Sequence, residues 1–125
     1  MKIAALIARI LLGLMFLVFG LNKFFNFIPQ PPMTGLAGEF VGAIYLSHEL
    51  RFIAALEVIA ALLLLSNFYV PLGLTLLGPI VVNIFLFHAF MEPSGLPIAC
   101  LTVILWLIVY QSVRSAFAGI FVKKT

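Results

Sequence analysis

The sequence predicts an all-α integral membrane protein: a bundle of four transmembrane helices with a short interfacial or re-entrant helix between the first two spans. Of its 125 residues, 65% are hydrophobic and 9% are charged, whereas a soluble domain carries about a quarter charged residues. The mean hydropathy is +1.29. Several apolar runs approach or exceed the roughly 18 residues that indicate a membrane span. We therefore expect residues 1–125 to form a single transmembrane domain.

The first span is predicted at about residues 3–25. Its start imitates a signal peptide, but Arg9 interrupts the apolar run and no small-x-small cleavage site follows, so we expect a retained helix. The segment NFIPQPPMTGLAG ends this helix with its three prolines. Residues 36–50 are too polar and too short to span. They favour an interfacial or re-entrant helix, with a plain loop as the alternative.

The other three spans are predicted at about residues 52–68, 71–90 and 96–113, and the last can extend further. The turns SNFYVP and MEPSGLP separate them. Pro71 suits the first turn of its helix. Pro79 lies inside the third span and removes the hydrogen bond to the carbonyl group of Thr75, so we expect a kink there.

The basic residues indicate an orientation. Four spans place both termini on one side of the membrane, and most of the basic residues fall on that side: Lys2, Arg9, Arg114, Lys123 and Lys124. The positive-inside rule then predicts cytoplasmic termini. Arg9 and Arg114 are expected to contact anionic lipid headgroups at the cytoplasmic surface. No basic tract with interleaved aromatic residues supports nucleic acid as a partner, and membrane lipid is the expected one.

Five polar side chains from three spans fall in the outer half of the bundle, and we interpret them as one ligand-binding or polar cluster: Asn22, Lys23, Glu57, Asn83 and His88. Glu57 lies roughly 8 Å into its span, where a lone carboxylate is costly. We expect it to pair with Lys23, and a purely structural helix clamp is the alternative. Asn83 and His88 are about 140° apart around their helix, which weakens their assignment to one wall.

Small residues accompany the polar ones on the first span. Residues spaced alternately by three and four share one helix face, and this face comprises Lys2, Ala5, Arg9, Gly13, Phe16, Gly20 and Lys23. The glycines favour close approach of a neighbouring helix. Cys100 is the only cysteine, so an internal disulfide and a C-x-x-C redox pair are excluded. No metal site is expected.

The sequence resembles the DoxX/DoxD-like family of small bacterial four-helix membrane proteins. The resemblance covers nearly the whole chain and is carried by ARILLGLMFLVFGLNKFFNF, LEVIAALLLLSNFYVPLGL and PIVVNIFLFHAFMEPSGLP. The positions that match the family pattern are Arg9, Gly13, Gly20, Lys23 and Glu57, with Asn83 and His88 in one subgroup. The resemblance implies a bacterial inner-membrane location and a link to membrane redox chemistry, because some members resemble subunits of a thiosulfate–quinone oxidoreductase.

Several functions remain open at this level. The first is a redox-linked subunit whose outer-half pocket binds a quinone-like or other small lipophilic molecule, with a redox protein or a second copy as partner. The second is a non-enzymatic membrane assembly subunit. A small transporter or proton pathway is a third, and haem binding by His48 and His88 a fourth. Whether the protein catalyses a reaction is left open, and no catalytic residue is assigned.

Overall fold

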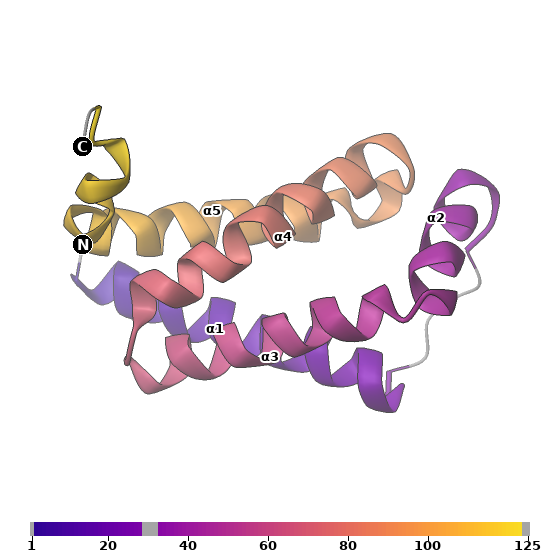
Figure 1. Ribbon diagram of the computed structural model, residues 1–125, viewed down its shortest axis with the longest axis horizontal. Coiled ribbons are helices and arrows are strands. Elements are labelled where there is room, and N and C mark those ends of the chain that lie inside the picture. The colour runs from indigo at the N-terminus through magenta and orange to yellow at the C-terminus, as the bar shows by residue number, and fades with distance from the viewer. Residues whose placement is uncertain (1, 29–32, 124–125) are drawn as a thin grey trace.

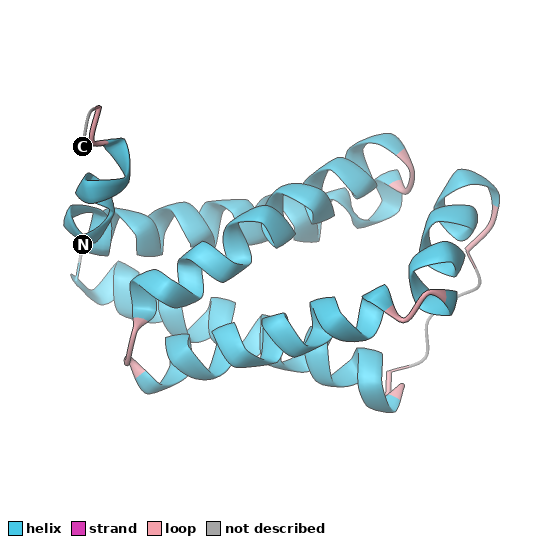
Figure 2. Cartoon of the chain, in the orientation of Figure 1, coloured by secondary structure: helices cyan, strands magenta, loops and turns pink. Residues whose placement is uncertain are grey.

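The computed structural model describes residues 2–28 and 33–123, and within them every regular element is a helix (Figures 1 and 2). Five α-helices and two 3-10 helices follow in the order α1 (Lys2–Phe25), α2 (Gly35–Leu46), α3 (Glu49–Ser66), α4 (Val70–Phe90), η1 (Pro93–Gly95), α5 (Leu96–Val113) and η2 (Arg114–Phe121). The all-α prediction is therefore confirmed.

The four long helices lie alongside one another in a bundle (Figure 1). Helix α1 contacts α3 and α5, and α4 contacts the same two helices, so the four form a closed ring. Helix α2 lies at one end of the bundle, where it packs on α3. The described ends of the chain both lie at the opposite end (Figure 1).

The helix boundaries agree closely with the sequence prediction. Among the four predicted spans, the largest difference is at the start of α3, which begins at Glu49 instead of residue 52. The short helix expected within residues 36–50 is α2. Among the described residues, three helical segments are long and apolar enough to cross a membrane, namely α1, α4 and the segment Pro93–Phe121 that contains α5. Helix α3 has 18 residues and carries three charged side chains, so it falls outside this group.

Two helices end at asparagines in the left-handed conformation. Asn26 follows α1 with φ 54°, and Asn67 follows α3 with φ 61°. Asparagine tolerates this conformation better than most residues. The backbone amide of Asn67 also donates to the carbonyl oxygen of Leu64, which satisfies one of the last acceptors of α3. These caps separate α1 and α3 from the segments that follow them.

The core lies along the axis of the four-helix bundle. Its largest fully buried apolar side chains are Phe16, Leu12, Leu64, Leu74, Leu77 and Val109. The outward faces are apolar as well: Leu62, Val82 and Ile104 are each more than half exposed. Helices that are apolar on both their inner and outer faces are typical of a protein surrounded by lipid. The buried residues also include two polar ones, Glu57 and Thr102.

Candidate functional site

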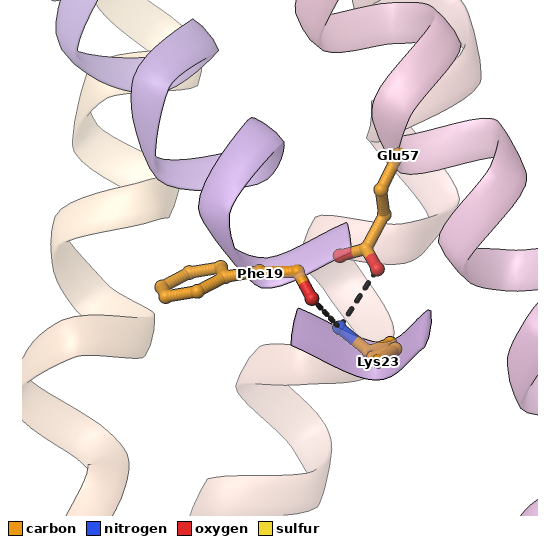
Figure 3. Close-up of polar contacts among 3 residues, drawn as sticks. All are labelled: Phe19, Lys23 and Glu57. Carbon is orange, nitrogen blue, oxygen red and sulfur yellow. Dashed lines mark hydrogen bonds and ion pairs between the residues drawn. The ribbon is translucent and has the colours of Figure 1, made fainter. Parts of the chain in front are cut away.

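A buried ion pair joins α1 to α3 (Figure 3). The ammonium nitrogen of Lys23, in the last turn of α1, lies 2.8 Å from Oε1 of Glu57. The Glu57 side chain is 1% exposed and the Lys23 side chain 26%. Lys23 Nζ also donates to the carbonyl oxygen of Phe19 at 3.4 Å, one turn earlier in its own helix. The predicted pairing of Lys23 with Glu57 is confirmed.

The second carboxylate oxygen of Glu57 lacks the ion-pair contact that Lys23 makes with the first. Oε2 is buried and has no hydrogen-bond donor within residues 2–28 and 33–123. Leaving a buried acceptor unpaired costs free energy, and the cost is larger for a charged group. Lys23 has three N–H groups, and its nitrogen lies close to Oε1 of Glu57 and to the Phe19 carbonyl oxygen. The pair therefore has an acceptor and a donor to offer to another group.

The ion pair lies beside Gly20, where α1 packs tightly against α3. A Cβ atom placed on Gly20 would lie 2.7 Å from Cγ2 of Val58 and 3.1 Å from the carbonyl oxygen of Ala54. A Cβ on Gly13 would lie 2.8 Å from Cγ of Leu65. Both glycines are buried, as is Phe16 between them. The predicted small-residue face of α1 is therefore the face that packs against α3.

Arg9 connects the same two helices at their other end. Its guanidinium donates to the carbonyl oxygens of Leu64 and Leu65, the latter at 3.5 Å. These carbonyls belong to the last turn of α3, where acceptors lack intrahelical partners and cations are favoured. Arg9 thus acts as a cap for α3. Its expected lipid contact remains a prediction, as does that of Arg114, which is exposed at the start of η2.

Asn22 and Asn83 make local hydrogen bonds. Oδ1 of Asn22 accepts from the backbone amide of Ile28 at 2.7 Å and shapes the turn after α1. Asn83 is exposed, and its Nδ2 donates to the carbonyl oxygen of Pro79 in the preceding turn of α4 at 2.9 Å. The hydrogen bonds of both side chains thus stay within their own stretch of chain.

His88 lies in the last turn of α4, next to the turn that leads to α5. Its Nδ1 lies 3.0 Å from the carbonyl oxygen of Glu92, and its ring meets Phe87 edge-on at 5.1 Å. Phe87 also contacts Phe40 of α2. In the described part of the chain, no hydrogen bond or ion pair links this histidine, Asn22 or Asn83 to the Lys23–Glu57 pair. Of the five predicted residues, the structure pairs two.

The structure also shows features that the sequence reasoning did not include in a site. The indole nitrogen of Trp106 donates to the carbonyl oxygen of Leu74 at 3.0 Å. The hydroxyl group of buried Thr102 donates to the carbonyl oxygen of Ala99 at 2.7 Å. Trp106 stacks on Tyr110 beside a groove between α4 and α5. The feature of the sequence that could have indicated this groove is Gly78 next to Pro79, both of which line it. No metal-ligand group occurs among the described residues.

The fold and the buried pair define the class: an all-helical, multi-pass membrane protein whose helices are joined by an ion pair in the bundle. A family model described as DoxX matches residues 4–89, which is more than half of the 125 residues. The chain belongs to the DoxX family, as its resemblance implied. No curated protein and no solved structure matches it.

Proposed function

We propose that this DoxX-family protein is a redox-linked subunit that binds a quinone-like or other small lipophilic molecule at the Lys23–Glu57 pair. The observation that supports the proposal is the buried Oε2 of Glu57, which has no donor among the described residues. A ring with hydroxyl groups would supply that donor, and a ring carbonyl would accept from the remaining N–H of Lys23. Glu57 is then placed to hold one of the two protons when a redox partner protein supplies or removes the two electrons that interconvert the carbonyl and hydroxyl forms of such a ring.

We further propose that α3 also spans the membrane, which brings the number of spans to four. Its 18 residues give a length of about 27 Å at 1.5 Å per residue, close to the roughly 30 Å of the hydrocarbon core. Glu49 and Arg51 lie in its first turn, within reach of the headgroups, and Glu57 is paired with Lys23. Helix α3 also contacts α1 and α4, both of which are long and apolar enough to cross.

The proposed location is the bacterial inner membrane with both termini in the cytoplasm. The two described ends of the chain lie together at one end of the bundle (Figure 1). Arg9, Arg114 and Lys123 belong to the segments at that end. Glu39, Glu49 and Glu92 belong to the opposite end. This distribution follows the positive-inside rule.

A second candidate function is a non-enzymatic assembly subunit in which the ion pair only clamps α1 to α3. The close contacts of Gly20 with Val58 and Ala54 favour it, because they leave little space between the two helices at this level. The local hydrogen bonds of Asn83 and His88 favour it as well, since neither side chain adds to the pair.

One experiment separates the two candidates. The protein is purified in mild detergent, and its unfolding temperature is measured with and without a short-chain quinone, while mass spectrometry detects any co-purified ring lipid. The redox proposal predicts that the quinone raises the unfolding temperature of the wild type but not that of Glu57→Gln. Glu39→Gln is the matched control, because Glu39 is an exposed carboxylate on α2.

The assembly candidate predicts another outcome. Glu57→Gln then lowers the unfolding temperature, and the quinone shifts neither the wild type nor the variant. If no ring lipid co-purifies and added quinone leaves the wild type unchanged, quinone binding at the Lys23–Glu57 pair is ruled out.

A further inference from the structure

A groove of about 480 Å³ opens between α4, α5 and η2, far along the chain from the Lys23–Glu57 pair. It belongs to the half of the bundle that holds the chain ends, because α4 begins and α5 ends there. Its walls are almost entirely apolar. The lining residues are Leu74, Thr75, Gly78, Pro79, Trp106, Leu107, Tyr110, Phe117, Ile120 and Phe121.

The aromatic wall of this groove is held in place. The Trp106 and Tyr110 rings stack with their centroids 5.5 Å apart and their planes at 7°, and Tyr110 also contacts Phe117 at 5.2 Å. The hydrogen bond from Trp106 to Leu74 fixes the indole against α4. Opposite it, a Cβ on Gly78 would lie 3.7 Å from Cζ2 of Trp106, so glycine keeps the space in front of the ring open. A fixed wall binds an apolar chain with little ordering cost.

A cation lies at one end of this wall. Helix η2 is a 3-10 helix, in which residues three apart lie one above the other. Arg114 therefore shares a face with Phe117 and Ile120, both of which line the groove. Arg114 is exposed and has no ion-pair partner within residues 2–28 and 33–123. Lys123 follows the end of η2 and is also exposed.

The acidic residues are placed elsewhere. The sequence has four of them, Glu39, Glu49, Glu57 and Glu92. Glu39 is on α2, Glu49 begins α3, and Glu92 follows α4, so these three are at the end of the bundle opposite η2. Glu57 is paired with Lys23. The groove thus combines an apolar wall with positive charge that no side chain of the described residues neutralises.

We infer that this groove binds one anionic phospholipid, with an acyl chain along the Trp106–Tyr110 wall and the phosphate at Arg114. A zwitterionic phospholipid has the same chains, but its headgroup carries a cation that Arg114 repels. Each basic side chain near the surface favours an anionic lipid by about 1 kcal/mol, which corresponds to a preference of roughly fivefold. This inference does not depend on the redox proposal, because it concerns another half of the bundle.

Trp106 is the single tryptophan of the chain, so its fluorescence reports on this groove alone. The full-length protein is reconstituted in phosphatidylcholine nanodiscs that contain a minor fraction of either phosphatidylglycerol or phosphatidylcholine brominated midway along the acyl chain. Bromine quenches the indole on contact. We expect stronger quenching by the brominated phosphatidylglycerol at equal mole fraction, and we expect high salt to remove the excess, since it screens the charge. Equal quenching by the two lipids would overturn the inference.

Substitutions test the binding sites of the phosphate and of the acyl chain separately. Arg114→Gln should abolish the excess quenching, whereas Arg51→Gln should keep it, because Arg51 is an exposed cation of α3 at the other end. Gly78→Leu fills the groove and should reduce quenching by both lipids. Gly42→Leu is its control, since a Cβ at Gly42 meets no atom within 4 Å. An excess that survives in Arg114→Gln, or indole emission that neither lipid quenches because a partner helix or a second copy covers the groove, would contradict the assignment.

Discussion

At the residue scale, Glu57 is the buried charged side chain in the described part of the bundle. Its side chain is fully buried, the Lys23 nitrogen lies 2.8 Å from one carboxylate oxygen, and no donor among the described residues reaches the other. Removing one partner of a buried pair leaves a charge without compensation, whereas replacing both partners with apolar groups is often neutral. Substitution of one member of the pair should therefore destabilise the bundle more than apolar replacement of both members.

Lys23→Met should lower the free energy of unfolding by about 3 kcal/mol, because it leaves the Glu57 carboxylate buried without its cation. The double variant Lys23→Met/Glu57→Leu should recover most of that loss. Equilibrium unfolding in mixed detergent micelles measures both. Lys123→Met is the control, since Lys123 is exposed beyond η2. A loss in Lys23→Met no larger than in this control would show that the pair contributes no stability.

Arg9→Gln should destabilise the end of α3. It removes charged hydrogen bonds to the carbonyl oxygens of Leu64 and Leu65, and such bonds contribute about 1.5–3 kcal/mol each. Hydrogen exchange should accelerate in the last turn of α3 and in the turn before α4. If exchange there instead matches that of Arg51→Gln, Arg9 does not cap this helix.

At the element scale, the α1–α3 interface depends on glycines more than on large side chains. Gly13 and Gly20 let the α1 backbone contact α3 directly, and the facing residues Ala54 and Ala61 are small and buried. Without a hydrophobic driving force in lipid, such close packing is what holds helices together. The interface is thus sensitive to the addition of a single methyl group.

Gly20→Ala should destabilise the protein by about 1–3 kcal/mol, because the new methyl group overlaps Val58 and the Ala54 carbonyl. Gly42→Ala should have the opposite sign, a gain of about 0.5–1 kcal/mol, since alanine favours the helix and the site is open. Thermal unfolding of both variants under the same detergent conditions provides the comparison. A stable Gly20→Ala protein would mean that α1 and α3 can separate without cost.

The elements were predictable from the sequence, but the partners of the polar side chains were only partly so. Prolines and apolar runs determine where helices begin and end, and the boundaries were close to those observed. The depth of Glu57 and Lys23 predicted their pairing because a buried charge needs a partner. Asn83 and His88 instead bond to a carbonyl group four residues away in the chain. Whether such a side chain bonds locally or across the bundle depends on its rotamer, and the position of a residue along a helix does not determine the rotamer.

At the scale of the whole molecule, the bundle has two ends of different charge. The chain ends, Arg9 and Arg114 belong to one, while α2, Glu49 and the η1 turn belong to the other. An even number of spans is the arrangement that brings both termini to the same surface. If α3 did not cross, the start of α4 would lie on the side where α2 is.

Cysteine labelling tests this arrangement. In a Cys100→Ala background, Ser94→Cys in the η1 turn should react with a membrane-impermeant maleimide in intact cells. Lys123→Cys should react only after the membrane is permeabilised. Both positions are exposed, so accessibility within the protein is matched. Labelling of Lys123→Cys in intact cells would invert or abolish the proposed topology.

The Lys23–Glu57 pair also bears on how the chain enters the membrane during synthesis. Helix α3 carries Glu49, Arg51 and Glu57 in 18 residues, and one acidic residue near the centre of a span costs about 2.5–3.5 kcal/mol on insertion. Helix α1 precedes it and carries the matching ammonium group. If α3 spans the membrane as proposed, we therefore expect α1 and α3 to enter the bilayer as a pair whose charges are already neutralised. In the proposed four-span topology, the synthesis of Lys23 before Glu57 thus lowers the cost of inserting α3.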